Sequence, residues 1–395
     1  MTRFVVRDLV SKGVLLVEDG NHGEYRPRPD EFVSEGIPFI RAADMSRGLV
    51  DFERAGRISE VARARVRKGI GAPGDVILSH KGTVGRVAVA PADSPDFVCS
   101  PQTTFWRSRD SEVLDQRYLR YLMSSADFVR QLDVLKGQTD MAPYVSLSDQ
   151  RSMEIVLLPI ARQRAIAEVL GALDDKIAAN ERICELADDL ARAKWRKART
   201  GGRQVALSEL ASFINGKAFT KGASGNGRVV IRIAELNSGV SGSTVYSDID
   251  VADDHLAQPG DLLFAWSGSL TVARWFRPAG IVNQHIFKVI PKHGCQMWMV
   301  NQALLAKLDD FKAIASDKAT TMGHIQRRHL DETTELPDIE VIRCIDAAMS
   351  VLWDRALAAE RENLKLAKTR DELLPLLMSG KLRVKDVETI AAEML

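Results

Sequence analysis

Apolar and small residues recur at alternating steps of three and four positions through the middle of the chain, across residues 160–199. The seam residues are Ile166, Leu170, Leu173, Ile177, Cys184, Ala187 and Ala191, and Asn180 occupies the place between the fourth and fifth of them. This heptad spacing predicts one long helix with a single apolar seam, about 60 Å long at about 1.5 Å per residue. Such a helix needs a second helix to cover its seam.

A second seam with the same alternation begins at Ile342 and continues to Leu377. Its members are Ile342, Ile345, Met349, Leu352, Ala356, Ala359, Asn363, Leu366, Arg370, Leu373 and Leu377. Residues 170–182 and 349–361 also match in sequence, and both end in Glu-Arg. We therefore predict that the two helices are copies that pair with each other. Two unrelated bundle helices are the alternative.

Each predicted seam contains one asparagine, Asn180 in the first and Asn363 in the second. A buried polar residue in an apolar seam lowers stability but selects one register and one partner. If the helices pair antiparallel, these two residues can set a single alignment. The alternative is that each asparagine faces solvent at a point where the pairing is loose.

The segments that precede the two predicted helices repeat the same order of elements. A short strand that ends in Ile-Arg occurs at residues 38–41 and 229–232, and Pro-Gly-Asp opens a buried strand at residues 73–79 and 259–265. The next match, between residues 101–105 and 283–287, aligns Gln102 with Gln284. A repeat of about 180 residues predicts two mixed α/β globules, each followed by a long helix.

The end of the chain extends this repeat. Residues 379–384 resemble residues 200–205, so we expect the C-terminal tail to return to the first globule. The predicted fold class is α+β, with two globular mixed α/β domains in a pseudo-twofold circular repeat, separated by two long antiparallel coiled-coil helices. The predicted domains are residues 1–158 (first globule), 159–199 (central helix), 200–338 (second globule), 339–380 (distal helix) and 381–395 (tail).

Composition narrows the class of protein. The 395 residues are 45% apolar, enough for two or three cores, and the net charge of +1 restricts any nucleic-acid surface to a local patch. The four cysteines lie far apart without a Cys-x-x-Cys pair, which is typical of a reducing compartment. Because no signal segment and no run of 18 apolar residues occurs, we expect a cytoplasmic protein without membrane association.

The signatures of common catalytic sites are missing from the sequence. It contains neither a phosphate-binding loop nor a His-Glu-x-x-His zinc motif. The stretch most similar to an amino-methyltransferase site, Met141-Ala-Pro-Tyr144, lacks the polar first residue and the second proline of such a site. The histidines have no second ligand at metal spacing. We therefore expect a non-catalytic protein without a metal site.

The loops that follow the two Pro-Gly-Asp strands carry polar residues suited to nucleic acid. The candidates are His80, Lys81, Thr83 and Arg86 in the first copy and Trp266, Ser267 and Ser269 in the second. Different side chains at equivalent places are what two modules with different targets require. A plain strand–turn–strand connection is the alternative for either loop alone.

Further candidates flank these loops. The aligned amides Gln102 and Gln284, with their neighbours Thr103 and His285, are suited to contact base edges, although an amide bonded to backbone is an equal alternative. The basic candidates for phosphate contacts are Arg41, Arg47, Arg232, Arg327 and Arg328. For each of these five alone, a solvated surface position is the alternative.

These features together resemble the specificity subunit of type I restriction–modification enzymes. The resemblance is carried by the two Pro-Gly-Asp units, residues 158–177 (LPIARQRAIAEVLGALDDKI), Met322-Gly-His-Ile325 and residues 373–384 (LLPLLMSGKLRV). It implies two target-recognition domains that each read one half of a split site in double-stranded DNA. The two helices would then set the spacing and bind two methyltransferase subunits. It also implies that S-adenosylmethionine, ATP and Mg belong to partner subunits, restriction subunits included, and that this chain holds no cofactor.

Two other classes of function stay open from the residues alone. A non-catalytic coiled-coil scaffold that binds protein partners would show no steep loss of DNA binding between about 50 and 200 mM salt. A stand-alone methyltransferase would itself bind S-adenosylmethionine.

Overall fold

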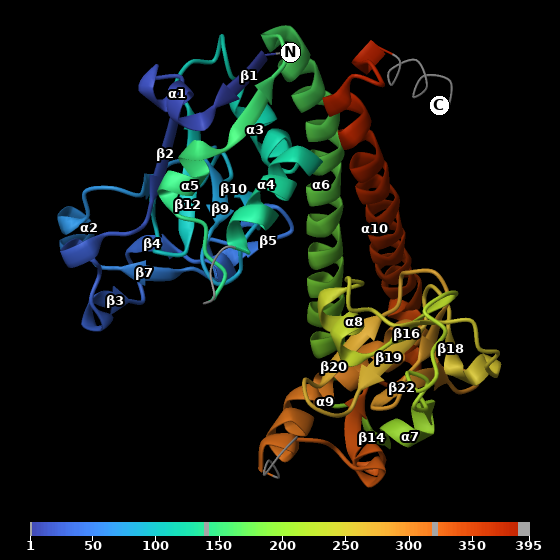
Figure 1. Cartoon of the computed structure of the whole chain (residues 1–395). Helices are drawn as coiled ribbons and strands as arrows, with labels where there is room; N and C mark the ends of the chain where they lie inside the picture. Colours follow the sequence, from blue (N-terminus) through green and yellow to red (C-terminus); the bar gives the residue numbers. More distant parts are fainter. Residues whose placement is uncertain (1, 138–141, 318–322, 386–395) are drawn as a thin grey trace. The chain divides into compact units, whose positions relative to one another are not determined.

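The computed structural model describes residues 2–137, 142–317 and 323–385 (Figure 1). The chain divides into two compact units, each of which is described by itself. Unit 1 consists of Met1–Asp174 and Lys368–Leu395, and unit 2 consists of Asp175–Ala367. The divisions fall inside two long helices, so each unit contains one globule and a segment of each helix.

Two sheets form the centre of the globule in unit 1. The first has the order β2 (Leu15–Asp19), β12 (Thr103–Ser108), β9 (Val76–Ser79), β10 (Val87–Val89), β6 (Leu49–Val50) and β5 (Met45–Ser46). The second has the order β3 (Phe32–Val33), β7 (Gly56–Ile58), β4 (Ile37–Ile40), β11 (Phe97–Cys99) and β8 (Ile70–Gly71). A separate pair joins β1 (Thr2–Val5) to β13 (Glu154–Leu157).

The central strand β9 is apolar on both faces because each face meets a different core. Val76 and Leu78 belong to a core shared with the helices, whereas Ile77 belongs to a core between the two sheets. The helices of this globule are α1 (Val6–Ser11), α2 (Glu60–Arg65), α3 (Gln116–Met123), α4 (Ala126–Lys136) and α5 (Leu147–Ser152). Side-chain caps start several of them; for example, the Asp115 carboxylate accepts from the Tyr118 amide at 2.9 Å.

Unit 2 repeats this arrangement with fewer strands. Its first sheet has the order β15 (Ala211–Asn215), β22 (Ile286–Pro291), β19 (Leu262–Ala265) and β20 (Thr271–Arg274). Its second has the order β17 (Tyr246–Ser247), β16 (Arg228–Ile231), β21 (Gly280–Val282) and β18 (Leu256–Ala257). A separate pair joins β14 (Arg203–Ala206) to β23 (Thr333–Leu336), and the helices are α7 (Leu207–Leu210), α8 (Ile233–Ser238) and α9 (Met297–Asp317).

Strand pairing shows that the two globules have the same topology. The pair β4 and β11 is parallel in unit 1, as is β16 and β21 in unit 2, and β9 and β19 each lie between two antiparallel neighbours. The apolar residues of β19 also alternate between a core shared with helices and a core between sheets. The prediction of an α+β chain with two repeated mixed α/β folds is confirmed.

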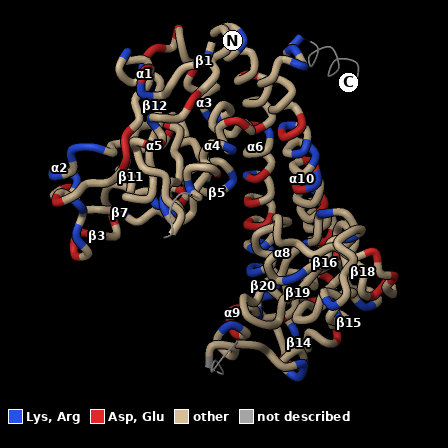
Figure 2. The backbone as a smooth tube through the Cα atoms, viewed as in Figure 1, with Lys and Arg blue, Asp and Glu red and all other residues tan. Residues whose placement is uncertain are grey.

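The two predicted long helices are present as α6 (Ile160–Arg199) and α10 (Ile339–Ser379) (Figure 1). Acidic and basic residues are distributed along both of them, as Figure 2 shows. Their seams are apolar, and Ile166, Leu170 and Met349 are among the seam residues that are buried. Burial of this apolar surface, rather than helix propensity, is the main stabilising contribution to helices of this kind.

Within unit 2 the two seam asparagines meet. Asn180 is fully buried, and its Nδ2 donates to Asn363 Oδ1 at 3.0 Å and to Glu362 Oε2 at 2.7 Å. Asn363 Nδ2 in turn donates to the Ile177 carbonyl at 3.2 Å, and the Cys184 thiol donates to the Ala356 carbonyl at 3.4 Å. Residue numbers therefore fall along α10 as they rise along α6, which is antiparallel pairing. The alternative that each asparagine faces solvent is excluded.

Within unit 1 the other ends of the same helices also pair antiparallel. Arg162 Nη2 donates to the Leu377 carbonyl at 3.2 Å, and Arg370 forms an ion pair with Asp174 at 2.7 Å. Beyond α10, Leu382 and Val384 pack against the helix-side core of this unit. The remainder of the predicted tail, residues 386–395, lies outside the described residues.

The asparagine pair, of which Asn180 is fully buried, predicts opposite effects for single and double substitutions. Asn180→Leu should lower the free energy of unfolding by about 1–3 kcal/mol, because Asn363 loses its partner and Glu362 a donor. Changing Asn363→Leu as well should recover stability but permit heptad-shifted pairings. Urea unfolding measures the first effect. Oxidative cross-linking of Cys184 to a cysteine introduced by Ala356→Cys measures the second.

The matched control is Glu185→Leu at an exposed position of α6, which should change the unfolding free energy by no more than about 0.5 kcal/mol. A single Asn180→Leu variant as stable as the parent would contradict the assigned role of the pair.

Candidate nucleic-acid interface

In unit 1, several chain segments meet at the edge of the sheets where β9 ends. The His80 amide donates to the Gln102 carbonyl at 2.8 Å, and the Val145 amide donates to the His80 carbonyl at 2.9 Å. The Gly82 amide donates to the Pro143 carbonyl at 2.9 Å. The loop after β9 is therefore held between the start of β12 and the segment that precedes α5.

Two more backbone bonds add the segments that follow β2 and β4. The Gly20 amide donates to the Thr103 carbonyl at 3.1 Å, and the Ser100 amide donates to the Ile40 carbonyl at 2.9 Å. A Cβ on Gly20 would lie 2.1 Å from the Cys99 carbonyl oxygen, so this close approach requires glycine. We define the loop edge of unit 1 as residues 20–22, 40–41, 80–86, 100–103 and 143–145.

Unit 2 has an equivalent edge where β19 ends. The Trp266 amide donates to the His285 carbonyl at 3.1 Å, and the Ile325 amide donates to the Trp266 carbonyl at 3.1 Å. The Gly268 amide donates to the Gly323 carbonyl at 2.9 Å. These bonds correspond one to one to the three around His80.

The glycine contact is repeated as well. The Gly216 amide donates to the Ile286 carbonyl at 3.0 Å, the Asn283 amide donates to the Ile231 carbonyl at 3.1 Å, and a Cβ on Gly216 would lie 2.2 Å from the Asn283 carbonyl oxygen. We define the loop edge of unit 2 as residues 216–219, 231–232, 266–270, 283–286 and 323–325. Both units thus present the same backbone arrangement, built from segments far apart in sequence.

These bonds correct the alignment of the two copies by one residue. His80 bonds to Gln102 and Trp266 bonds to His285, so the residue equivalent to Gln102 is His285 and not Gln284. Gln102, Gln284 and His285 are all exposed, but only Gln102 and His285 occupy the same place in the fold.

The error arose from two phenylalanines that match in the sequence and not in space. Phe105 lies in the core between the sheets of unit 1, whereas Phe287 lies in the helix-side core of unit 2. A shift of one residue along a strand exchanges its two faces, and a match of single letters does not reveal on which face a residue lies.

Most candidates in the loop of unit 1 reach solvent. The exposed candidates of this loop edge are Arg41, Lys81, Thr83, Arg86 and Gln102. Lys81 Nζ lies 5.9 Å from the centre of the Tyr144 ring, and Arg86 Nη1 donates to the Ala42 carbonyl at 3.0 Å. Lys81 has no ion pair among the residues that the structure describes, so its charge is available to an anionic ligand.

Three candidates are buried and belong to the interior of the loop edges. His80 is 1% exposed and donates from Nδ1 to the Val145 carbonyl at 2.9 Å, and Thr103 is 0% exposed and donates to the Ile40 carbonyl at 3.0 Å. Ser267 is 5% exposed and lies in a β-bridge with His324. Their side chains stabilise the loops and are not part of the surface that a ligand can reach. The sequence does not distinguish them from the exposed candidates, because the alternation of buried and exposed positions in a loop has no sequence period.

Arg41 and Arg232 occupy equivalent places and form equivalent ion pairs. Arg41 bonds through Nε and Nη2 to Asp44 at 3.1 and 3.0 Å, and its amide donates to the same carboxylate at 2.9 Å. Arg232 bonds through Nε and Nη2 to Glu235 at 3.0 and 2.6 Å, and its amide donates at 3.0 Å. Both carboxylates are buried, so these arginines also stabilise the turn after the strand.

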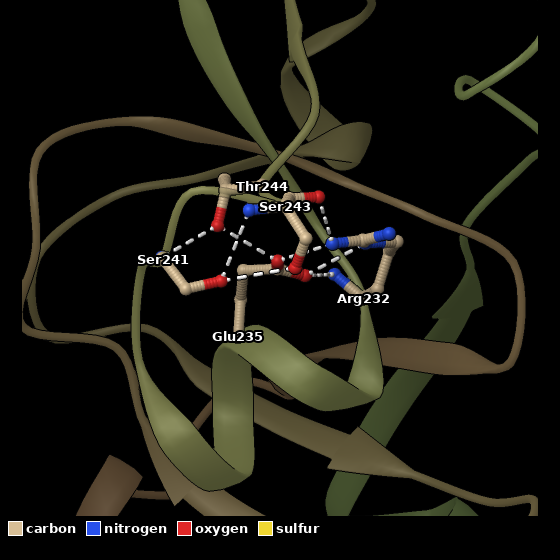
Figure 3. A network of polar contacts seen from close by, with 5 residues as sticks. All are labelled: Arg232, Glu235, Ser241, Ser243 and Thr244. Carbon is tan, nitrogen blue, oxygen red and sulfur yellow. Dashed lines mark hydrogen bonds and ion pairs between the residues drawn. The ribbon is translucent and has the colours of Figure 1, made fainter. Parts of the chain in front are cut away.

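In unit 2 this ion pair is extended by the loop that follows α8 (Figure 3). Arg232 Nη2 also donates to the Ser243 carbonyl at 2.8 Å, and the Thr244 hydroxyl donates to Glu235 at 3.0 Å. Burial disfavours the charge of Glu235, but the bonds from Arg232 and Thr244 hold its pKa below the usual value. The carboxylate is therefore ionised at neutral pH and fixes the guanidinium at the loop edge.

Aromatic rings distinguish the loop edge of unit 2 from that of unit 1. The Trp266 ring lies 5.2 Å from the His285 ring and 6.4 Å from the His324 ring, and its Nε1 donates to Asn215 Oδ1 at 2.8 Å. His285 has a φ of +73°, which a residue with a side chain adopts only when its surroundings impose it. Ser269 and Gln284 are exposed beside them.

The remaining basic candidates lie apart from these bonds. Arg47 is exposed in the turn between β5 and β6. The carbonyl of its neighbour Gly48 accepts from the Val89 amide, and Val89 is at the end of β10 that is farther from the loop edge. Arg327 and Arg328 are exposed in a short 3-10 helix, Arg327–Asp331, that begins two residues after the loop edge of unit 2.

Several residues of these edges escaped sequence reasoning. Asn215, Lys217, Tyr144 and His324 line them, and Lys217 forms a β-bridge with Asn283. The signal available for the first two was the glycine shared by Asp19-Gly20-Asn21 and Asn215-Gly216-Lys217. Glycine is too common for one shared glycine to mark these positions as equivalent in the sequence. Its close contact with the backbone is visible only in the structure.

A hollow of about 550 Å³ adjoins the loop edge of unit 1. It is lined by Asn21, His22, Gly23, Glu24, Tyr25, Arg67 and Lys68. The Arg67 guanidinium lies 4.4 Å above the Tyr25 ring, whereas Lys68 is paired with Asp19 at 3.0 Å. Lys and Arg residues are frequent around α2, in the same part of the chain (Figure 2).

Part of the chain matches one known protein family. Residues 22–186 match the family described as "Type I restriction modification DNA specificity domain". The match covers less than half of the chain: it includes the loop edge of unit 1 from residue 22 onward and residues 160–186 of α6. The comparison with curated protein sequences gave no match.

One of three matching solved structures has a TM-score above 0.5 and shows the same fold. The S subunit of a type I restriction-modification system from M. genitalium is 14% identical, with 95% of each chain covered and a TM-score of 0.57. The HsdS subunit from Thermoanaerobacter tengcongensis is 18% identical over 96% of this chain and 97% of that chain, with a TM-score of 0.37. A chain from a structural study of complex assembly in the type I R-M system is 18% identical over 96% and 98%, with a TM-score of 0.39.

The buried His80 predicts a loss of stability in mild acid. Burial lowers its pKa, opposed by the bond to Val145 and by Asp19, and Lys81 lowers it further. Between an unfolded-state pKa of about 6.5 and the lower folded value, the unfolded chain binds the proton first, so stability falls as the pH falls. Unfolding free energies measured from pH 7.5 to pH 5 should decline less steeply for His80→Asn, which retains a donor for Val145.

The control His293→Asn removes an exposed histidine and should leave the decline unchanged. Equal slopes for the parent and His80→Asn would show that this imidazole does not titrate with unfolding.

Proposed function

We propose, from the match of residues 22–186 to the type I restriction modification DNA specificity domain family, that the chain is the DNA sequence-specificity subunit of a type I restriction–modification system. In this function the loop edge of unit 1 reads one half of a bipartite site, and the loop edge of unit 2 reads the other half.

The observation that carries the proposal is the repeated loop edge. The family match covers only the first copy, but five backbone hydrogen bonds and one close glycine contact recur at equivalent places in unit 2. The second copy therefore has the backbone of a DNA-reading module without the sequence similarity. Nothing observed favours a scaffold that binds protein partners.

The exposed side chains of the two edges suit two different targets. Unit 1 presents Lys81, Thr83, Arg86 and Gln102, which can bond to phosphates and base edges, whereas unit 2 presents the half-buried Trp266 beside the exposed histidines His285 and His324. Because the backbone is shared and the side chains differ, the two modules should bind DNA in the same orientation and select different bases.

The helices and partner subunits complete the proposal. α6 and α10 set the length of the unread spacer and bind two methyltransferase subunits, and restriction subunits join the full complex. This chain carries out no catalytic step and holds no cofactor; S-adenosylmethionine, ATP and Mg belong to those partners. Cytoplasmic location is part of the same proposal. Among the described residues, the helices are too short or too polar to cross a bilayer.

The decisive experiment is the methylome of the host strain with and without this gene. The intact strain should methylate a split motif with unspecified central bases, and its half-sites should lie on one face of the duplex, about 34–36 Å apart. Deletion should abolish that methylation, and exchange of residues 1–158 should change one half-site only. An unchanged pattern after deletion, with the methyltransferase subunits expressed, would refute the proposal.

Lys81 provides a direct test of the loop edge of unit 1. Lys81→Ala should weaken DNA binding about equally for all sequences and reduce the slope of log K against log salt by about 1, because one phosphate contact is lost. Titration of the reconstituted complex with DNA at several salt concentrations measures this slope.

The matched control is Lys12→Ala. Lys12 also lies over an aromatic ring, 5.8 Å from Phe4, but it precedes β2 at the end away from the loop edge. If both variants keep the parental slope, Lys81 does not contact a phosphate.

A further inference from the structure

One arginine in unit 2 joins the sheet of the loop edge to both long helices. Arg274 is the last residue of β20, whose first residue, Thr271, directly follows the loop of residues 266–270. β20 pairs with the central strand β19 along its whole length, from Ala265 opposite Thr271 to Leu262 opposite Arg274. A movement at Arg274 is therefore transmitted to the loop edge through one short, hydrogen-bonded strand.

The side chain of Arg274 is 5% exposed and contacts three residues of the helices. Its Nε and Nη2 bond to the two oxygens of Glu360 on α10 at 2.8 and 3.1 Å, and its Nη1 and Nη2 lie 3.5 Å from the two oxygens of Asp188 on α6. The guanidinium carbon lies 4.7 Å from the centre of the Trp353 ring, also on α10. The planar group is thus oriented by two carboxylates and one ring face.

This arrangement specifies an angle as well as an attachment. A planar guanidinium with two parallel bonds to one carboxylate fixes both distance and direction, which an apolar contact does not. Replacement of buried ion pairs by apolar residues is often neutral or stabilising, so stability alone is a weak reason for this one. Burial raises the pKa of Glu360, and Arg274 offsets part of that effect.

Unit 1 holds its helix segments by a different group of residues. The residue of β10 equivalent to Arg274 is Val89, since Val89 pairs with Val76 as Arg274 pairs with Leu262. In its place, Asp174 of α6 accepts bonds from Arg370 of α10 at 2.7 Å, from Tyr121 at 2.7 Å and from Arg120 at 3.1 Å. The ion pairs that attach the helices are therefore not shared by the two repeats, because each unit forms them with residues at different positions.

We infer that Arg274 is a positioning residue that fixes the angle between the DNA-reading sheet of unit 2 and the helix pair, and thereby the spacer length that the protein accepts. The inference rests on the proposed function. In this inference the helices set the distance between the half-sites, and Arg274 sets the orientation in which the sheet of unit 2 contacts the second half-site. One base pair more or fewer moves that half-site by about 3.4 Å and by about one tenth of a turn, so a fixed angle excludes it.

The test uses the full chain in the host strain with its partner subunits. The variant Arg274→Met with Glu360→Gln removes both buried charges together, so neither is left unpaired, while Asp188 is solvated. Methylation should be scored at sites with the parental spacer and at sites with one base pair more or fewer. We expect methylation at the off-length sites to rise on the order of tenfold, the effect of about one mismatched base pair, with both half-sites unchanged.

Arg274→Lys is the second variant, because it keeps the charge and loses the two-pronged bond. It should give a smaller rise at the same off-length sites, and it decides the question if the double variant fails to fold, as judged by thermal unfolding. The matched control is Arg182→Gln, which breaks an exposed ion pair with Glu185 on α6 and should change nothing. A folded variant that loses methylation equally at all spacers, or keeps the parental spacer preference, overturns the inference. If the parent itself yields no bipartite motif, the proposed function fails instead.

Discussion

The antiparallel pairing of α6 and α10 is the interaction on which both globules depend. The helix-side core of unit 1 contains Ile166 and Leu170 from α6 and Leu377 from α10. That of unit 2 contains Trp195 from α6 and Met349 from α10. Neither core is complete without residues from both helices, so each globule buries its apolar face only when the helices pair. The chain must therefore return on itself, and the repeat is circular for this physical reason.

The pairing is specified by polar residues rather than by the apolar seam. Leucine, isoleucine and alanine repeat every heptad, so an apolar seam tolerates shifts by seven residues. Asn180 Nδ2 can donate to Asn363 Oδ1 in one register only, and Glu362 accepts a further bond from Asn180. Within the helix pair, apolar contacts thus supply stability, and a few oriented polar groups select one arrangement; the proposed reading of DNA would follow the same rule.

The two loop edges show how one backbone can present two surfaces. The close approaches at Gly20 and Gly216 and the bonds around His80 and Trp266 hold the same segments together in both units. Exposed side chains in between take no part in these bonds and are free to differ. This separation explains why the buried candidates His80, Thr103 and Ser267 prove to be structural, while Lys81 and Gln102 remain suited to contact a ligand.

The sequence by itself determined the long helices, the place of one asparagine in each seam and the order of the repeated segments, because heptad spacing and recurring motifs are local or periodic signals. Only the tertiary structure decided the alignment of Gln102 with His285, the burial of candidate loop residues and the contacts of Arg274 with Glu360 and Asp188. These depend on strand faces and on residues distant in sequence that meet across a core. No period along the chain encodes them.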